Sequence, residues 1–483
     1  MPRAFLFLCM VCAQRSMGQG DSVAVQFTAH PDTVHNAITL AATVGQIGAT
    51  VVNQDDAAPI TALSWSGALT LKASQPKWHF DARYEWMRDT GTRFDRWTEA
   101  GFDRRHGEGQ MATRLRGRWN WHPLPSVKVE VGRDTLHDGH GRRSLFRGGQ
   151  AAPVPFVQVS LDGGGRLRYR HRMEALQGHA HIDCRTGATG DPRTWVPPTG
   201  PLRTGIQRML VSHRLELDLG GRFTGALWGA VVWNAAAGQR VFEPHYLLPM
   251  TSLRPTEYMQ GSSDNALVGL EGLLRLGQGG PDCPRHLYGQ FLLDELIVSE
   301  LLGGTEWWGN KHGLLGGLLW TTRWGGWRIE GSAVRPWTYS HYTPTSAYLT
   351  GLTPLAHPLG ANFVEGTFSG HWSNGTWTVT ALVTHSLRGD DLRGDTPSGS
   401  LPQVGDIDRT EETYAWLNGT ARKRWLGAMD IGRAWPVAEE MTLTAFAQVA
   451  HGRETAPVAP APTQEWWLSF GLRSTGPFFG ADW

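Results

Sequence analysis

Apolar and polar residues alternate strictly through long stretches of this chain of 483 residues. Between Lys77 and Arg88 the apolar positions are Trp78, Phe80, Ala82, Tyr84 and Trp86, and the polar ones between them are His79, Asp81, Arg83 and Glu85. Successive side chains of a β-strand point to opposite faces. The stretch therefore predicts a strand with one apolar and one polar face.

A second stretch, from Gly165 to Leu176, carries arginines on its polar face, and these are Arg166, Arg168, Arg170 and Arg172. Arginines turned away from lipid need water or carboxylates. We therefore expect all four to line the interior of a closed sheet, near Asp or Glu from other strands. Alternation alone fits a soluble sandwich as well as a membrane barrel, so other features must decide between them.

The connections between the predicted strands alternate between short and long. Besides 77–88 and 165–176, strands are predicted at 36–48, 60–72, 110–121, 127–133, 154–161, 206–218, 222–233, 265–276, 285–298, 312–322, 326–336, 362–373, 376–387, 424–434, 441–451 and 465–475. Short turns such as 220–221 alternate with long loops such as 134–153 and 337–361. Outer-membrane barrels have short periplasmic turns, long outer loops and an even number of strands. The sequence predicts an all-β, transmembrane outer-membrane β-barrel of about 18 antiparallel strands.

Composition and the chain start agree with an exported membrane protein. The 60 Gly and 23 Trp exceed what a soluble enzyme uses, whereas barrels use aromatic residues at both membrane interfaces. Residues 1–18 predict a cleaved signal peptide, 19–35 a short periplasmic segment, and 36–483 a single barrel domain. We expect the protein in the outer membrane of a gram-negative cell, in contact with its lipid. A net charge of +1 argues against nucleic acid as a partner.

The cysteines predict neither a disulfide-stabilised scaffold nor a lipid anchor. Cys9 and Cys12 lie inside the apolar core of the signal sequence. Cys184 falls in a long loop and Cys283 in a short turn, on opposite sides of a bilayer core about 30 Å thick. We expect no disulfide between them, because a disulfide requires neighbouring Cα atoms.

Several polar and aromatic clusters interrupt the alternation. They read GRDTLHDGHGRRSLF (132–146), LRPTEY (253–258), YGQFLLDE (288–295), WWGNKHG (307–313) and RPWTYSHY with AHPLGANF (335–363). Their order and wording resemble the Wzi-type capsule-assembly proteins and the related gliding-motility proteins called RemB, over residues 110–390. The resemblance implies a barrel whose exposed part binds or organises surface polysaccharide, with export or motility proteins as partners in the gliding relatives. The chain departs from the family pattern at Arg147, Gly148 and Gly149, and 19–35 leaves little room for a periplasmic helical segment.

The same clusters supply the candidate site residues. Arg143 and Ser144 lie in a glycine-containing loop that could fold back as a plug, where they are internal fastenings or ligand contacts. Aromatic rings and polar groups that could stack on and contact sugars, or belong to an interface girdle, are Trp307, Asn310, Arg335, Trp337, Tyr339, His341, His357 and Asn362. Asp294 and Glu295 point to opposite faces, and Arg335 or Arg254 is the expected partner of the lumenal one.

No cofactor, metal or catalytic group is predicted. His137, Asp138 and His140 do not have a zinc-site spacing, and Ser144 near His140 lacks the G-x-S-x-G turn of many hydrolases. The leading interpretation is a non-enzymatic surface protein. A passive or anion-selective channel is the main alternative, and a barrel enzyme acting on lipid or polysaccharide is a third.

Overall fold

The computed structural model describes residues 23–28, 37–54, 60–89, 104–106, 111–177, 207–235, 244–247, 264–277, 285–342, 344–351, 353–390, 397–438, 441–456 and 463–474. The signal-peptide prediction, Cys184, Cys283 and Arg254 lie outside these residues. The strands are β1 (Val23–Thr28), β2 (Ala37–Gln54), β3 (Ile60–Gln75), β4 (Trp78–Asp89), β5 (Arg104–His106), β6 (Met111–Leu124), β7 (Val127–Asp134), β8 (Val154–Gly163), β9 (Leu167–Leu176), β10 (Gln207–Asp218), β11 (Phe223–Ala235), β12 (Asn265–Arg275), β13 (Arg285–Glu295), β14 (Lys311–Thr322), β15 (Gly325–Val334), β16 (Leu349–Thr350), β17 (Thr353–Pro354), β18 (Phe363–Ser373), β19 (Trp377–Asp390), β20 (Thr420–Ala438), β21 (Met441–Thr455) and β22 (Thr463–Ser474).

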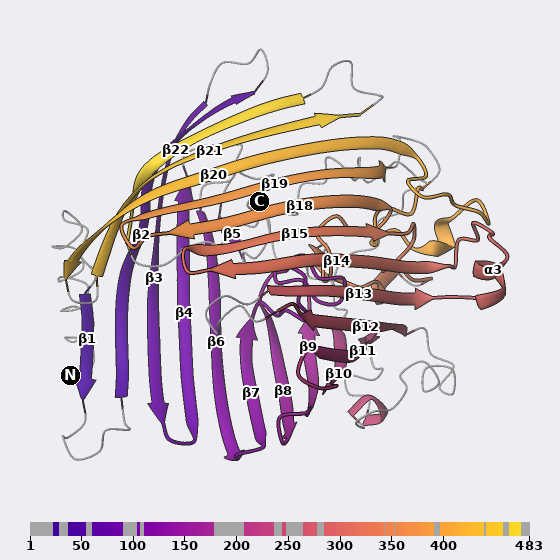
Figure 1. The fold of residues 1–483 in the computed structure, drawn as a ribbon, viewed down its shortest axis with the longest axis horizontal. Coiled ribbons are helices and arrows are strands. Elements are labelled where there is room, and N and C mark those ends of the chain that lie inside the picture. The colour runs from indigo at the N-terminus through magenta and orange to yellow at the C-terminus, as the bar shows by residue number, and fades with distance from the viewer. Residues whose placement is uncertain are drawn as a thin grey trace.

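The long strands pair in sequence order, and the last returns to the first. β22 pairs antiparallel with β21 and also with β2, from Gln46 opposite Arg473 to Gln54 opposite Glu465. The described pairings thus join 18 strands into a ring, which confirms the predicted count. In Figure 1 the β3–β9 wall runs steeply while the β14–β22 wall crosses it, as the tilted strands of a barrel do.

The two faces of the ring have different chemistry. On β13 the buried residues Tyr288, Gln290, Leu292 and Asp294 face inward, and the intervening residues face outward. Leu270 lies in register with Leu227 and Phe291 on the outward face, and Leu270 and Leu227 are exposed. Exposed tryptophans flank this apolar band. Those near the short turns are Trp121, Trp324, Trp377 and Trp435, and those near the long loops are Trp425 and Trp466. This is the architecture of an outer-membrane β-barrel.

Helices are few in the described part of the chain. The five-residue α3 (Val298–Leu302) follows β13, and the short η2 (Pro244–Leu247) packs Tyr246 against Trp233 of β11. None of the described helices is both long and apolar enough to cross a bilayer.

Residues 23–28 form β1, which pairs with the first residues of β2 and was not predicted as a strand, because six residues are too few for alternation to stand out. The expectation of a periplasmic segment at 19–35 stays a prediction. The expectation of a strand at 285–298 was wrong at its end. The strand stops at Glu295, which pairs across a register shift with Lys311, the first residue of β14, and α3 begins at Val298. The apolar residues Leu296, Ile297 and Val298 hid this end in the sequence.

Leu270→Arg places a charge in the middle of the outward apolar face. We expect it to lower the free energy of unfolding from a bilayer by about 2–4 kcal/mol, because a charge there loses its hydration. Urea titration in vesicles and the heat-dependent gel shift measure the effect. Leu302→Arg is the control, because Leu302 is 82% exposed on α3 outside the barrel wall. Equal stability of the two variants would contradict the assignment of this face to lipid.

Candidate functional site

The loop 135–153, here called the plug loop, lies inside the ring and contacts four buried wall carboxylates. Arg147 pairs with Glu174 of β9 at 3.1 Å, and the His140 amide donates to Glu271 of β12 at 2.7 Å. The Arg142 and Arg143 amides donate to Glu330 of β15 at 2.8 and 3.2 Å. The Arg143 guanidinium pairs with Glu365 of β18. One loop is thereby tied to strands spread over half the ring.

In one further contact the charges are reversed, with the acid on the plug loop and the arginines on the wall. Asp138 of the plug loop accepts hydrogen bonds from Arg170 and Arg172 of β9, the latter at 2.5 Å, and from Nε1 of Trp228 at 3.3 Å. Burial alone would raise the pKa of Asp138, but the two guanidinium groups outweigh it and hold that pKa well below the usual range. Asp138 therefore stays charged at every physiological pH, which keeps the loop attached to β9.

The four arginines of the predicted ladder do not share one environment. Arg172 is buried and Arg170 is half-buried against Asp138, whereas Arg168 is half-exposed and pairs with Glu216 of β10. Arg166 is exposed in the turn before β9 begins, so its assignment to the lumen wall is corrected. The reason is that the strand starts at Leu167, two residues later than the alternation suggests.

A close approach of backbone to wall fixes the tip of the plug loop. Gly139 has φ +94°, and a Cβ there would lie 2.0 Å from Nε2 of Gln290 and 2.7 Å from Oε1 of Glu271. Oε1 of Gln290 accepts from the Ser144 hydroxyl at 3.2 Å and the Leu145 amide at 2.9 Å. Ser144 is fully buried, so its hydroxyl fastens the loop to β13.

The loop 335–362, here called the second loop, packs beside the plug loop. The Tyr339 hydroxyl donates to the Leu145 carbonyl at 2.9 Å, and the Gly148 amide donates to the Leu355 carbonyl at 2.8 Å. Arg208 of β10 donates to the carbonyls of Thr345 at 2.5 Å and Leu349 at 2.8 Å. The wall thus holds this loop by its backbone.

His357 fastens the far end of the second loop. Its Nε2 lies 3.0 Å from Glu365, and its Nδ1 accepts from the Leu359 amide at 3.2 Å. Because Nδ1 accepts, the ring is the neutral Nε2–H tautomer. Burial lowers the pKa of His357 in spite of the nearby Glu365 carboxylate, in agreement with that tautomer.

The segment 397–419, here called the third loop, covers the second. Lys311 of β14 pairs with Asp406 at 2.6 Å and with Glu295 at 2.9 Å. Asn362 donates through Nδ2 to the carbonyls of Gly389, Ser398 and Asn418. Arg335 donates to the Tyr414 carbonyl at 2.9 Å. The inward-facing acid of β13 is Asp294, whose Oδ2 accepts from the Tyr339 amide at 2.7 Å, while Arg254, one of the two arginines expected beside it, lies outside the described residues.

The aromatic candidates divide by exposure. Trp337 is 0% and Tyr339 is 1% exposed, so neither offers a ring face to a sugar, and Asn310, Arg335, His357 and Asn362 are also buried. Trp337 has φ +65° and its amide donates to the Gly399 carbonyl at 2.8 Å, which turns the ring inward onto Tyr414. Trp307 and His341 remain partly exposed. The expectation that Trp337 and Tyr339 stack on a glycan is corrected to packing.

A partly exposed aromatic group does occur at the loop end. Trp307 and Trp308 lie with ring centroids 5.5 Å apart, and Arg409 stacks 3.8 Å from the Trp308 ring centroid. Arg335 connects this pair to Trp416, which is 39% exposed. Its guanidinium donates to the Trp307 carbonyl at 3.4 Å and lies 5.6 Å from the Trp416 ring centroid. We call Trp307, Trp308 and Trp416 the rim patch. Trp416 could not be predicted from the sequence, because a single tryptophan in a long loop carries no pattern.

Other wall residues were missed although a signal existed. Arg114, Arg116 and Arg118 of β6 face inward, where Arg114 pairs with Glu85 at 2.6 Å and Arg118 with Asp134 at 2.6 Å. They alternate with Leu115 and Trp119, the same pattern that singled out β9. Glu271, Glu330 and Glu365 carried no such signal, because single acidic residues on a polar strand face are common.

The metal and hydrolase arrangements that the sequence raised do not assemble. Asp138 is bound by arginines, and His140 lies 3.2 Å from Glu271. Among the described residues no group of three or more His, Cys, Asp or Glu could hold a metal ion. The Ser144 hydroxyl bonds to Gln290 and not to a histidine.

No protein-family description and no curated protein matches this sequence. Among solved structures, the chain is similar to Wzi of Escherichia coli, an outer-membrane protein involved in group 1 capsule assembly and a carbohydrate-binding β-barrel. The TM-score is 0.49 at 11% identity, covering 96% of this chain and 87% of that one. It is also similar to OccAB2 of Acinetobacter baumannii, with TM-score 0.48, 7% identity and coverage of 91% and 98%. It is similar as well to OprD of Pseudomonas aeruginosa, with a TM-score of 0.43 at 10% identity, covering 92% of this chain and 96% of that one. These likenesses do not decide between functions.

Asp138→Asn removes the carboxylate that Arg170 and Arg172 share and leaves Glu174, 2.8 Å from Arg172, as the nearest acid. We expect docking of the plug loop to weaken by about 3 kcal/mol, because unpaired charges in a buried site are unfavourable. Planar-bilayer recordings should show more frequent open events, and amide exchange at 135–153 should speed up. Asp162→Asn, at the exposed end of β8, is the control. Unchanged conductance and exchange in Asp138→Asn would contradict this role.

The second loop should loosen in mild acid. The pKa of His357 is lowered in the docked loop, so the undocked state binds more protons once pH falls below the ordinary value of 6.5. Docking free energy is therefore full above that pH and declines below it. The protection factor of the Leu359 amide, which is its exchange rate corrected for the intrinsic pH dependence of exchange, should be lower at pH 5.5 than at pH 7.5. His357→Gln, which cannot be protonated, should show no such difference; a retained difference would assign the effect to another group.

Proposed function

We propose that the protein is an outer-membrane surface protein of the capsule-assembly type, which binds or organises extracellular polysaccharide without catalysing a reaction. The observation that carries the proposal is the buried set of ion pairs with β9 and β18 and of amide hydrogen bonds to the carboxylates of β12 and β15 that hold the plug loop. A freely conducting pore does not require a loop that buried charged groups hold inside its lumen. In a surface scaffold, such a loop makes the outer surface rigid.

The rim patch supplies a binding surface of suitable chemistry. Trp307, Trp308 and Trp416 are each at least partly exposed, and Arg409 and Glu412 lie beside Trp308, with Glu412 accepting from Nε1 of Trp308 at 2.9 Å. Aromatic faces beside charged hydrogen-bonding groups suit sugar rings, which have both apolar C–H faces and hydroxyls. Such a patch binds a long chain through many weak contacts.

A deletion strain complemented with variants tests this proposal. Replacing Trp307 and Trp416 together by Ala should lower the surface polysaccharide that cells retain several-fold, because each lost ring removes a stacking site. Trp307 and Trp416 are only partly buried, so the variant should reach the membrane at normal level and keep its heat-dependent gel shift. Trp377→Ala, at the short-turn end, is the matched control. Normal retention in the double variant, or equal loss in Trp377→Ala, would count against the rim patch.

An anion-selective channel is the second candidate, and the arginines along β6 and β9 favour it. Arg114, Arg116, Arg168 and Arg170 form a basic array on the inner wall. Recordings of the wild-type protein decide between the two candidates, since sustained anion-selective conductance would support the channel and a closed baseline the scaffold.

A further inference from the structure

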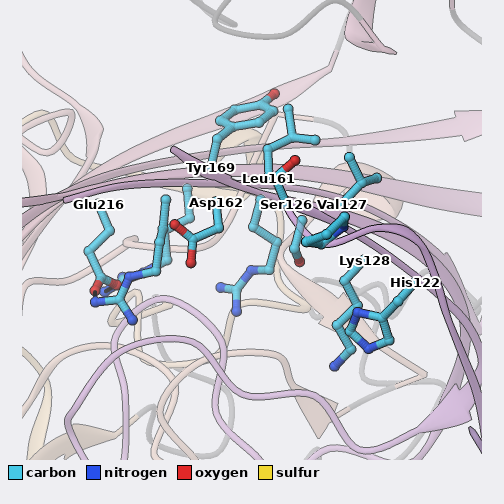
Figure 2. Close-up of a pocket in the computed structure, with 13 residues that line it drawn as sticks. His122, Ser126, Val127, Lys128, Leu161, Asp162, Tyr169 and Glu216 are labelled. Atoms are coloured by element: carbon cyan, nitrogen blue, oxygen red, sulfur yellow. Dashed lines mark hydrogen bonds and ion pairs between the residues drawn. The ribbon is translucent and has the colours of Figure 1, made fainter. Parts of the chain in front are cut away.

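The cations of the inner wall have carboxylate partners, even around the cavity at the short-turn end. Those that line this cavity are Lys128, Arg168, Arg170 and Arg214, and they pair with Glu130, Glu216, Asp138 and Glu271 in that order. Figure 2 shows Lys128 and Asp162 on the same side of the strands as Glu216, so the cavity holds both signs of charge. Among its described lining residues, no lysine or arginine is left over for a ligand.

Two cations on the outward face of the wall differ in this respect. Lys423 of β20 and Arg453 of β21 are exposed, and within the described part of the chain neither forms an ion pair. Their neighbours Arg422 and Glu454 pair with each other at 3.3 Å on the inner face, so alternation turns Lys423 and Arg453 outward. Charge on that face is unfavourable in the middle of a bilayer and tolerated near its surfaces. The height of the two cations along the strands therefore decides what they contact.

The two cations lie at the upper edge of the apolar band, beside the aromatic girdle of the long-loop end. On β20 the outward residues Trp425 and Trp435 bracket the apolar Met429 and Ile431. A barrel strand rises about 3.3 Å per residue and tilts by about 40°, so the two tryptophans are about 25 Å apart along the membrane normal, the height of the apolar band. Lys423 lies beyond Trp425, on the side away from Trp435. It is therefore at the level of the headgroups of the outer leaflet.

The register of the strands brings Lys423 and Arg453 together. Lys423 is opposite Thr455 and Arg453 is opposite Trp425, so the two cations are diagonal neighbours on one face. Diagonal neighbours are about 7–8 Å apart, within reach of long side chains that converge on one group. The described outward residues of β19 to β22 include no acid. This face is therefore complementary to a phosphate, whose oxygens accept hydrogen bonds from both Lys and Arg.

The positive charge is local to β20 and β21. On β12, β15 and β18 the outward residues nearest to the long loops are Ala266, Ala333 and Val364. Arg133 of β7 also lies outward near that end, but it donates to the Leu115 carbonyl of β6. An anionic headgroup is therefore favoured at one place on the wall and not around its whole circumference.

Neighbouring side chains indicate what else the headgroup carries. His385 of β19 is exposed and in register with Trp425, and Thr455 is exposed opposite Lys423. An imidazole and a hydroxyl thus flank the cations, and both bond to sugar hydroxyls.

A row of rings lies on the bilayer side of these polar groups. His451 is in register with Trp466, and its ring centroid lies 4.1 Å from that of Trp466 and 5.3 Å from that of Trp425. Tryptophan rings prefer the level at which headgroups meet acyl chains. From the rim toward the bilayer centre, the wall therefore offers groups that suit a phosphate, a sugar and acyl chains.

We propose that Lys423 and Arg453 bind a phosphate group of a phosphorylated glycolipid in the outer leaflet, with His385 and Thr455 beside its sugar. Trp425 and Trp466 then lie where its acyl chains begin. The inference rests on the outward face of the barrel and not on the proposed polysaccharide function, so either can fail without the other. One lipid molecule would thereby be held at β20 and β21.

Native mass spectrometry of the purified barrel in a non-ionic detergent, titrated with diphosphoryl lipid A, tests the site. We expect one lipid A per chain, with affinity that falls as salt rises. Lys423→Gln combined with Arg453→Gln should weaken binding at least about tenfold, because each cation near a lipid headgroup contributes about fivefold. Lys423→Arg, which keeps the charge, should bind as the wild type does. Phosphatidylglycerol or inorganic phosphate in tenfold excess should not displace lipid A, because the first lacks the sugar and the second lacks the acyl chains.

Arg433→Gln is the matched control. Arg433 is also an exposed outward cation of β20, but it lies at the short-turn end, 5.1 Å from the Trp435 ring centroid. This variant should bind lipid A as the wild type does. The proposal is overturned by absence of binding to the wild type, by unchanged binding in the double variant, by equal loss in Arg433→Gln, or by displacement with phosphatidylglycerol or phosphate. The heat-dependent gel shift of each variant shows that its barrel is folded.

Discussion

The pairing of β22 with β2 is the contact on which the rest of this molecule depends. Lipid offers no partner for backbone amides and carbonyls, so a strand in a bilayer must be paired along both edges. β2 achieves this by pairing with β3 along one edge, and with β22 and β1 along successive parts of the other. Closure then allows opposite chemistries on the two faces, an apolar band outside and a polar compartment inside.

The side chains inside that compartment are arranged so that each buried charge has a partner. The inner wall carries Arg170 and Arg172 on β9 and carboxylates on β9, β12, β15 and β18, and the plug loop supplies the groups that pair with them. Each wall carboxylate receives a different donor, so a shift of the loop by one residue would leave several charges unpaired. Buried ion pairs of this kind add little net stability, but they select one position of the loop over others.

The sequence predicted the wall far better than its contents. Alternation such as that of Trp78 to Trp86 follows from backbone geometry, so strand positions and the count of 18 could be obtained from local pattern. Arg143 could be recognised as needing a carboxylate, but Glu365 could not be named, because nothing local distinguishes it from other acids. Exposure of the aromatic residues was equally inaccessible. Trp337 has the composition of a sugar platform, and only its left-handed backbone, bonded to Gly399, turns it inward.

The plug loop also constrains the order of assembly. Arg142 and Arg143 bind acids that lie 188 and 222 residues away in the chain, on β15 and β18. When residues 135–153 leave the ribosome and cross the inner membrane, most of the wall that holds them does not yet exist, and contacts so distant in sequence form slowly. The contacts with Glu330 and Glu365 therefore form only after β15 and β18 have joined the sheet, whereas those with β9 can form earlier. Complete docking is then a late event that requires a nearly complete wall, and a barrel stalled before β15 would carry a loop docked on the earlier strands alone.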